Sequence, residues 1–501
     1  MINLSQRKTF FWIILSLVII LRLISLDKGI AYDEKQTFLY AKAPFAEKME
    51  LIRHHFSNPP LTVSLLYFWM LPSQNEVWVR LYFVLFGVGL CILVYLIGKE
   101  YLGDEFGLLS FALAGFSPLL IWASQYIRGY VDSAFWIVLS SFFFLKMIKG
   151  RYTRSVCAGY IISSALALYT FYFTALILLS QGLYLLIFWW RDRPLLKRWL
   201  SCTCLTGLLF APWVPVAFSQ IAIVTGVRQL PFKGFQILGL PIGMFLRNLM
   251  TMVGMEPYFL SAGASEILDN KFLLLNVILI LLIFVAVLIL GCLSLKRLNK
   301  GGRVDFWFFV FLSLGPVILA NTLGRMLSLS ANAKYLVAPQ AMFIYFFAAV
   351  IYYFILQRKK KYAYIFCLCL LSLFLLRLPS AYTAEFDFKG AHSFICAESQ
   401  GKGCIFVFKK RFDEFALPAV DLGEFFQRDK ASGEYLSLPD IKAKELKERA
   451  SGCARIYLYL SFGRDKVFGA NKAAKAFFNR NFELDKKKTF RNIEVLSYKK
   501  R

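Results

Sequence analysis

Apolar runs long enough to cross a bilayer dominate this chain. A helix needs about 20 apolar residues to span the hydrocarbon core, and such runs recur from the N-terminus until Pro379. Hydrophobic residues make up 58% of the sequence, which is too apolar for a soluble protein of 501 residues. The sequence therefore predicts a polytopic α-helical membrane protein.

About eleven transmembrane helices are expected by this length criterion. The first run, FFWIILSLVIILRLISL, follows a short basic head and lacks a small-residue cleavage site, so it predicts a retained signal anchor. The other runs cover residues 78–98, 106–124, 131–147, 155–170, 172–190, 200–220, 272–295, 304–323, 335–356 and 362–378.

Lysine and arginine gather in every second connection between these runs. The basic connections are SQRK at the start and residues 146–154, 191–198, 296–303 and 357–361. Short basic loops stay on the cytoplasmic side of a membrane, so we expect a multi-pass protein of the inner (plasma) membrane with a cytoplasmic N-terminus. The outer segments are then 27–77, 124–130, 221–270, 324–334 and everything from Ser380 onward.

Two domains follow from this change in composition. Residues 1–379 are expected to form the transmembrane domain, with long outer loops at 27–77 and 221–270, and residues 380–501 a small soluble α/β domain outside the membrane. In this tail, 405–410, 454–462 and 491–500 have the pattern of strands, and 438–451 and 471–482 that of helices. The tail shows no obvious nucleophile or phosphate-binding loop, so we expect an accessory role.

The formal net charge of +27 raises the question of nucleic acid. No basic module with interleaved aromatic residues is present, and much of the excess charge lies in the topology loops, so we expect no nucleic-acid partner. A basic exposed surface suits anionic lipid headgroups or an anionic glycan.

Two adjacent carboxylates stand out in the first outer loop, in the stretch AYDEKQTF. Asp33 and Glu34 follow the first apolar run by a few residues, and a loop of this length is commonly functional. The loop continues with FAEKMELIRHHF (45–56), which has the spacing of an amphipathic interfacial helix. After it, Asn58-Pro59-Pro60 breaks the helix before an apolar element that is too short to cross the membrane.

An ordered set of motifs resembles the GT-C glycosyltransferases, a family of polytopic enzymes that includes protein O-mannosyltransferases and the lipid A aminoarabinose transferase. The motifs run from residue 10 to about residue 350: YDE after the first span, NPPL before the second, EVWVRLYFVLFG, FSPLLIWASQYIRGY, LALYTFYFTALILLSQGLYLL and AKYLVAPQAMFIYFFAAV. The resemblance implies transfer of a sugar from a polyprenyl-phosphate donor to a lipid, polysaccharide or protein acceptor at the outer membrane face.

The same resemblance assigns roles to particular residues. It makes Asp33 the catalytic base, with Glu34 as a neighbour that tunes the pocket or holds a cation. Single displacement would invert the anomeric centre, and cations at the predicted outer ends of the spans would stabilise the departing phosphate. The candidates for donor phosphate binding are Arg128, Arg325, Lys334 and Arg80, and those for substrate binding are Tyr130, Tyr335 and His55.

Two positions depart from the family pattern. Lys334-Tyr335 stands where related enzymes often have Arg-Tyr, and Phe171 where they often have histidine. The sequence requires no cofactor, and a divalent metal stays an open possibility.

Several plainer interpretations remain open. Asp33 and Glu34 could be a solvated pair, Arg128 could pair with Asp132 one helical turn away, and Arg325 and Lys334 could be interfacial side chains that reach toward water. A transporter or flippase of a lipid-linked glycan is the alternative function. That class is expected to show two related halves with broken helices, and we find no convincing internal repeat.

Overall fold

The computed structural model describes most of the first three quarters of the chain and parts of the tail. The chain divides into two compact units, Met1–Leu26 with Thr37–Tyr382, and Asp27–Gln36 with Thr383–Arg501. The described residues are 4–30, 32–55, 58–227, 236–237, 240–241, 248–249, 251–252, 271–300, 302–326, 333–382, 394–395, 397–398, 404–407, 435–437, 455–461, 475–490 and 493–499.

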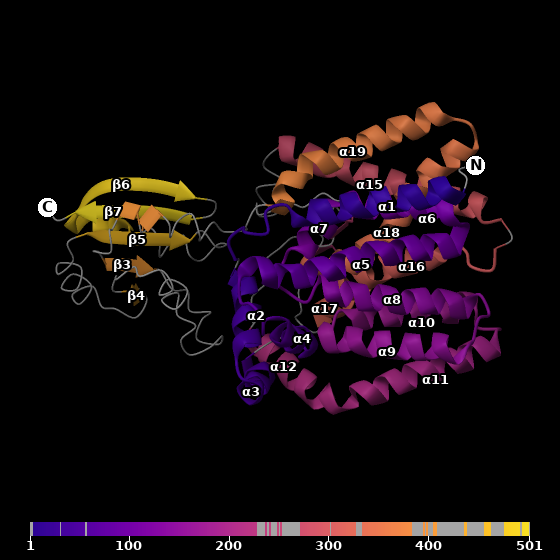
Figure 1. The fold of residues 1–501 in the computed structure, drawn as a ribbon, viewed down its shortest axis with the longest axis horizontal. Coiled ribbons are helices and arrows are strands. Elements are labelled where there is room, and N and C mark those ends of the chain that lie inside the picture. The colour runs from indigo at the N-terminus through magenta and orange to yellow at the C-terminus, as the bar shows by residue number, and fades with distance from the viewer. Residues whose placement is uncertain are drawn as a thin grey trace. The chain divides into compact units, whose positions relative to one another are not determined.

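The first unit is a bundle of helices that run side by side (Figure 1). Every expected apolar run coincides with one or two of them. The helices are α1 Leu4–Leu23, α5 Glu76–Leu102, α6 Asp104–Phe116, α7 Pro118–Ser124, α8 Val131–Ile148, α9 Arg154–Thr170, α10 Thr174–Phe188, α11 Arg193–Phe210, α12 Val214–Val227, α15 Lys271–Leu298, α16 Trp307–Ser313, α17 Gly315–Met326, α18 Val337–Leu356 and α19 Lys360–Tyr382.

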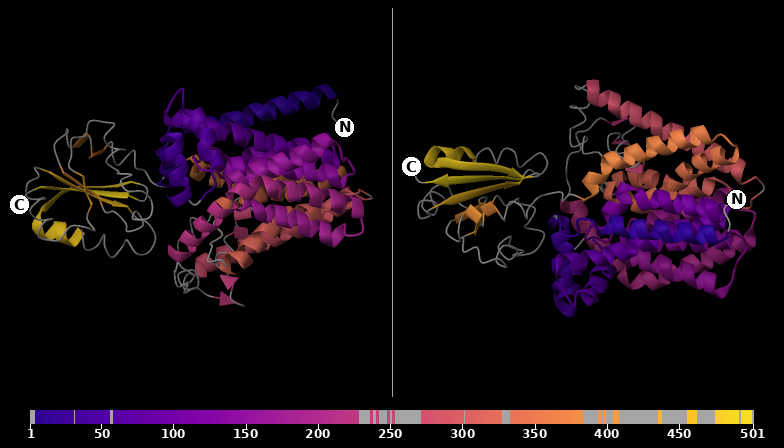
Figure 2. Two further views of the ribbon diagram at one scale, coloured as in Figure 1. Left: turned by 90° about the horizontal axis from the view of Figure 1, so that it is seen from below. Right: turned by 45° about the horizontal axis from the view of Figure 1, so that its top comes forward.

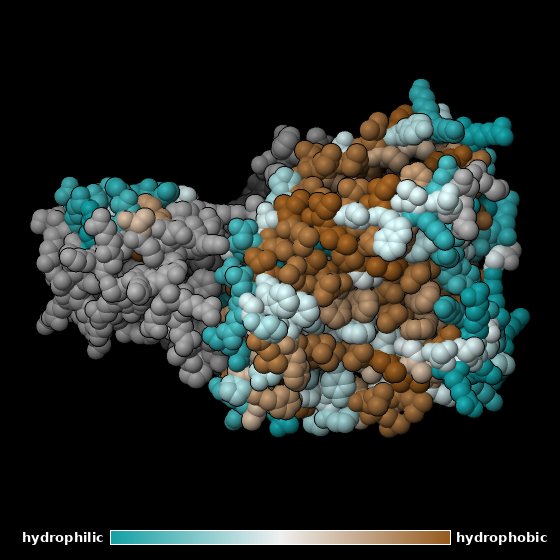
Figure 3. Space-filling model, viewed as in Figure 1, coloured by the Kyte–Doolittle hydropathy of each residue, from teal (hydrophilic) through white to brown (hydrophobic). Residues whose placement is uncertain are grey.

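The bundle has the surface expected of a membrane protein. A band of hydrophobic residues crosses its visible face, with hydrophilic residues toward both ends (Figure 3). Among the described residues, six helices are long and apolar enough to span a bilayer, or seven if the bent pair α6–α7 forms one span. The helical membrane class is therefore confirmed, whereas the expected count of about eleven spans stays a prediction.

The run 106–124, expected as one straight span, is broken. Helices α6 and α7 meet at Ser117 with a bend of 65°. Pro118 occupies the first turn of α7, where its missing N–H is tolerated, and the residue before a proline avoids the helical region. Ser117 accordingly has an extended backbone, with φ −63° and ψ 118°.

Short helices at one end of the bundle build the first long connection. They are α2 Tyr32–Lys42, α3 Phe45–His55 and α4 Leu61–Trp69. Helix α3 confirms the amphipathic helix expected at 45–56. Helix α4 follows Pro59 and Pro60 and is 9 residues long, far too short to cross a membrane.

The basic connections lie together at the opposite end of the bundle. Ion pairs tie Arg7 to Glu105 at 3.2 Å, Arg151 to Glu100 at 3.2 Å, and Arg303 to Asp192 at 2.7 Å. This grouping matches the alternation of basic and other loops in the sequence. We refer to this end as the predicted cytoplasmic end, and to the end that carries α2–α4 as the predicted outer end.

The second unit contains a mixed five-stranded sheet of order β4-β3-β5-β7-β6. Strands β3 and β4 and strands β3 and β5 pair in parallel, whereas β7 is antiparallel to both β5 and β6. The strands are β3 Cys404–Val407, β4 Tyr435–Ser437, β5 Ile456–Ser461, β6 Glu483–Phe490 and β7 Ile493–Lys499. A helix at 475–481 places the ring of Phe478 5.6 Å from that of Tyr498.

These elements confirm three expected strands and one expected helix of the α/β tail. The expected helix at 438–451 lies outside the described residues. So does most of the loop 221–270, in which the structure describes the short pair β1 Gln236–Ile237 and β2 Leu240–Pro241.

Candidate functional site at the predicted outer end

The turn of residues 125–130, which links α7 to α8, is held by buried polar side chains. Arg80 on α5 is fully buried, and its Nη1 donates to the carbonyl of Gln125. The side chain of Gln125 donates from Nε2 to the carbonyls of Arg22 at 3.0 Å and Ile24 at 2.7 Å. Helices α1, α5 and α7 therefore fix the position of this turn together.

Arg22 lies fully buried behind the same turn. Its guanidinium donates to Ser124 Oγ at 3.0 Å, to the carbonyl of Val18 at 3.1 Å and to that of Gly115 at 3.2 Å. Its hydrogen-bond acceptors among the described residues are all neutral, and none of the described carboxylates pairs with it. Close packing encloses it, since a Cβ on Gly87 would lie 2.0 Å from Ser124 Oγ.

Arg128 lies within the turn and is 8% exposed. Its Nη1 donates to Thr37 Oγ1 on α2 at 3.3 Å, so it connects the turn to the first outer loop. The alternative expectation was an ion pair with Asp132. No such pair forms between these two side chains, both of which the structure describes.

Asp132, on the first turn of α8, is a buried carboxylate that the sequence analysis did not nominate. It accepts a hydrogen bond from Thr62 Oγ1 on α4 at 2.8 Å and one from the N–H of Ser133 at 3.0 Å. Gly129 makes room for the Thr62 contact, since a Cβ at this position would lie 2.7 Å from Thr62 Oγ1. The sequence did carry a signal for this residue, because Asp132 is an ionisable residue inside the apolar run 131–147.

Aromatic side chains from distant parts of the chain line a pocket beside this turn. The Tyr335 ring lies 5.0 Å from Phe171, 5.7 Å from Phe173 and 5.9 Å from Tyr130, measured between centroids. Ser133, Thr174 and Lys334 contribute polar groups, and Ile177 and Ala338 complete the lining. The pocket encloses about 230 Å³, part of it open to solvent.

Lys334 brings a positive charge to this pocket. Its ammonium donates to Tyr126 Oη at 3.4 Å and lies 5.4 Å from the centre of that ring. A cation beside several hydroxyl groups and apolar ring faces can hold an anionic, partly apolar ligand. Phe171 forms part of the pocket wall.

The structure thus brings some nominated residues together and separates others. Tyr130, Lys334 and Tyr335 line one pocket, whereas Arg80 is buried beneath the turn. Glu34 is buried in the first turn of α2. The structure describes the backbones of Asp33, His55 and Arg325 but not their side chains.

Lys48 on α3 is a second charged residue that the sequence analysis missed. Its ammonium is buried, has no hydrogen-bond acceptor in the part of the chain that the structure describes, and lies 3.6 Å from the centre of the Tyr67 ring. Burial lowers the pKa of Lys48 from 10.5 to about 8. Lys48 lies one turn before the buried Ile52, so its position on the buried face of α3 could have been read from the helical spacing.

No group of three or more histidine, cysteine, aspartate or glutamate side chains among the described residues could hold a metal ion.

The chain matches no protein-family model and no curated protein. It resembles solved structures. ArnT from Cupriavidus metallidurans, bound to undecaprenyl phosphate, superimposes with a TM-score of 0.54 at 11% identity, over 98% of this chain and 97% of that one. The archaeal oligosaccharyltransferase AglB from Archaeoglobus fulgidus gives a TM-score of 0.48 at 12% identity, over 91% of this chain and 69% of that one. The likeness to ArnT extends over nearly the whole of both chains, and it confirms the GT-C fold that the motifs predict.

Proposed function

We propose that this protein is an inverting glycosyltransferase that moves a sugar from a polyprenyl-phosphate donor to a hydroxyl group of a lipid, glycan or protein acceptor at the outer face of the membrane. The observation that carries the proposal is the aromatic pocket of Tyr130, Phe171 and Tyr335 with Lys334 at its edge. It lies beside a turn held by buried arginines, in a fold similar to that of ArnT, whose structure contains undecaprenyl phosphate.

The proposed reaction is one displacement. A carboxylate oxygen of Asp33 takes the proton of the acceptor hydroxyl as its oxygen attacks the anomeric carbon. The new carbon–oxygen bond forms while the bond from that carbon to the phosphate oxygen breaks, and the electron pair leaves with the phosphate. Attack from the opposite side inverts the sugar.

Cations stabilise the charge that collects on the leaving phosphate. We assign this role to Lys334 and Arg128, with Arg325 as a further candidate. Arg80 is assigned a positioning role, since its guanidinium donates to the Gln125 carbonyl and so holds the turn that carries Arg128.

The base assignment rests on the sequence, in which Asp33 belongs to the YDE motif of the first outer loop. We therefore propose Asp33 as the base. Tyr130 and Tyr335 are proposed to contact the sugar.

The decisive experiment incubates the purified full-length protein with a panel of polyprenyl-phosphate sugars and membrane acceptors, and measures transfer by mass spectrometry. Asp33→Asn should abolish detectable transfer while donor binding persists. Glu47→Gln, an exposed acidic residue of the same outer loop, is the matched control and should retain wild-type transfer. Equal transfer by wild type and Asp33→Asn would remove the base assignment.

Two further arms address the alternatives. Transfer in the presence of EDTA, followed by addition of Mg²⁺ or Mn²⁺, determines whether a divalent metal takes part. Movement of a lipid-linked glycan across vesicles containing the wild-type protein, without transfer to any acceptor, would instead favour a flippase.

A further inference from the structure

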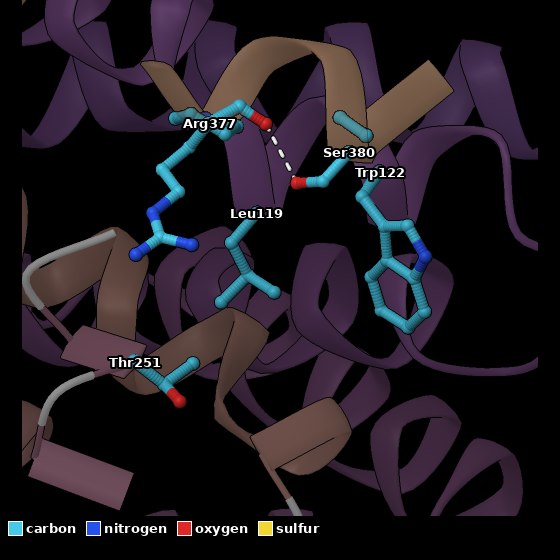
Figure 4. Close-up of a pocket in the computed structure, with 7 residues that line it drawn as sticks. Leu119, Trp122, Thr251, Arg377 and Ser380 are labelled. Atoms are coloured by element: carbon cyan, nitrogen blue, oxygen red, sulfur yellow. Dashed lines mark hydrogen bonds between the residues drawn. The ribbon is translucent and has the colours of Figure 1, made fainter. Parts of the chain in front are cut away.

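A second pocket lies between α7 and the end of α19. Its lining residues are Pro118, Leu119, Trp122, Thr251, Arg377, Ser380 and Ala381, and it is partly open to solvent. Figure 4 shows Leu119 in the centre, with Arg377 and Thr251 on one side and Trp122 on the other. The Ser380 hydroxyl donates to the Arg377 carbonyl at 2.7 Å within the last turn of α19.

Positive charge lies on both sides of α7. Leu119 and Trp122 face the pocket that contains Arg377, whereas Ser124 accepts the hydrogen bond from the buried guanidinium of Arg22. In the part of the chain that the structure describes, the guanidinium of Arg22 has neutral acceptors alone. In a low-dielectric interior, such a charge raises the positive potential over a longer distance than it would in water. An anion in the pocket is therefore favoured by Arg377 directly and by Arg22 through α7.

The helix that carries Arg377 is open to lipid along its length. α19 lies at the margin of the bundle (Figure 2, right). Leu376, the neighbour of Arg377, is 79% exposed, and this apolar exposure continues back along the helix through Leu375, Leu371 and Leu368. An acyl or prenyl chain lying on this stripe would bring its headgroup to the end of the helix, where Arg377 is.

We propose that this pocket binds the phosphate group of a membrane lipid whose apolar chain lies along α19. Arginine is suited to this ligand because its fork of N–H donors matches phosphate oxygens. The hydroxyl of Thr251 provides a further polar contact, and Trp122 covers the apolar part of the headgroup.

The site is separate from the aromatic pocket of Tyr130, Phe171 and Tyr335, but aromatic rings connect the two. Trp122 in this pocket packs against Tyr126 with centroids 4.5 Å apart and the rings tilted, and Tyr126 lies 5.9 Å from Tyr130 of the aromatic pocket. Two aromatic contacts, Trp122–Tyr126 and Tyr126–Tyr130, therefore connect the proposed phosphate site at Arg377 to the pocket that contains Lys334. Either a phospholipid of the bilayer or a polyprenyl phosphate carries the required group, and only the polyprenyl case rests on the proposed glycosyltransferase function.

The test is a lipid titration of the purified full-length protein in neutral detergent, followed by native mass spectrometry. Phosphatidylglycerol is compared with diacylglycerol, and polyprenyl phosphate with polyprenol, so that each pair differs by its phosphorylated headgroup. We expect at least one phosphorylated lipid to bind about ten-fold or more tightly than its match. Arg377→Gln should weaken binding of that lipid, and in a Lys334→Gln background, where the aromatic pocket no longer contributes, it should remove the preference; the lipid whose binding is lost identifies the source of the phosphate.

Three controls keep the result specific. Lys361→Gln, at the other end of α19 and exposed, should bind lipid as the wild type does. Arg377→Lys keeps a positive charge and should retain part of the affinity, which separates loss of charge from loss of fold. The loss caused by Arg377→Gln should persist in a Lys334→Gln background, because the two cations serve different pockets. Equal binding of both phosphorylated lipids by Arg377→Gln and wild type would overturn the proposal without affecting the transfer reaction. No preference for polyprenyl phosphate over polyprenol in the wild type would instead count against the donor proposed for that reaction as well.

Discussion

The hydroxyl of Thr62 donates a 2.8 Å hydrogen bond to the carboxylate of Asp132, 70 positions further along the chain. This contact ties α4, in the first outer loop, to the first turn of α8. A buried carboxylate depends strongly on its hydrogen-bond donors, because an unsatisfied buried charge bears its full desolvation cost. The first outer loop and the start of α8, directly after the 125–130 turn, are therefore coupled through this side-chain pair.

Replacing Thr62 with valine keeps the shape and removes the donor. We expect Thr62→Val to lower the free energy of unfolding by about 1.5 to 3 kcal/mol, the range for hydrogen bonds to charged groups. Thermal unfolding in detergent measures this. Thr206→Val is the matched control, since the Thr206 hydroxyl is buried but donates to the carbonyl of Cys202 one turn earlier in its own helix. Equal losses in the two variants would contradict the special role of the Asp132 contact.

Gly129 tests the same coupling from the opposite side. An alanine Cβ would lie 2.7 Å from Thr62 Oγ1 and 3.4 Å from the carbonyl of Thr170, so Gly129→Ala should push Thr62 away from Asp132 and lower both stability and sugar transfer. Gly207→Ala is the control, because nothing lies within 4 Å of its Cβ position. That substitution should be neutral or stabilising by up to about 1 kcal/mol, from helix propensity. A Gly129→Ala protein as stable and active as Gly207→Ala would refute the steric argument.

Hydrophobic runs and local breakers predicted much of the fold. The helices follow the runs because a run of apolar residues in a membrane must satisfy its backbone internally, and α3 follows from its amphipathic spacing. Strand β6 was not predicted, because ELDKKKTF lacks the usual apolar alternation of a strand. It lies at the edge of the sheet, where lysines are common because they discourage further pairing.

The candidate site could be predicted only in part. Tyr130, Lys334 and Tyr335 were nominated from their motifs, and the structure places them in one pocket. The burial of Arg22 was not visible in the sequence, because its acceptors Gly115 and Ser124 lie 93 and 102 positions away. Spacing along a helix identifies which residues share a face, but not which distant carbonyls will meet it.

Lys48 should make stability depend on pH. Its pKa is about 8 in the folded protein and 10.5 in the reference state, so below pH 8 both states are protonated and the cost of burying the charge is fully present. Between pH 8 and 10.5 the folded protein releases the proton while the unfolded chain keeps it, so stability rises with pH, by at most roughly 3 kcal/mol. Above this window the cost disappears.

Lys48→Met removes the charge and keeps a long flexible side chain. It should be more stable than wild type at pH 7, and the difference should shrink as the pH rises toward 10. Unfolding temperatures measured from pH 7 to pH 10 give the comparison, with the exposed Lys42→Met as control for other titrating groups. If the unfolding temperatures of the wild type and of Lys48→Met change with pH in parallel, burial does not lower the pKa of Lys48.

Lys334 provides the sharpest kinetic prediction for the proposed reaction. Its ammonium lies at the edge of the aromatic pocket, 3.4 Å from Tyr126 Oη, and is proposed to meet the donor phosphate. If it contacts phosphate in both the bound donor and the transition state, Lys334→Gln should raise the donor KM roughly ten- to a hundred-fold with a small change in kcat. If the contact strengthens only as the phosphate departs, kcat should fall instead, since the lost interaction then belongs to the transition state.

Initial rates over a range of donor concentrations separate these outcomes, with Lys361→Gln as the control for loss of one surface charge. Unchanged kcat and KM in Lys334→Gln would exclude this cation from donor binding and leave Arg128 as the described candidate for the phosphate.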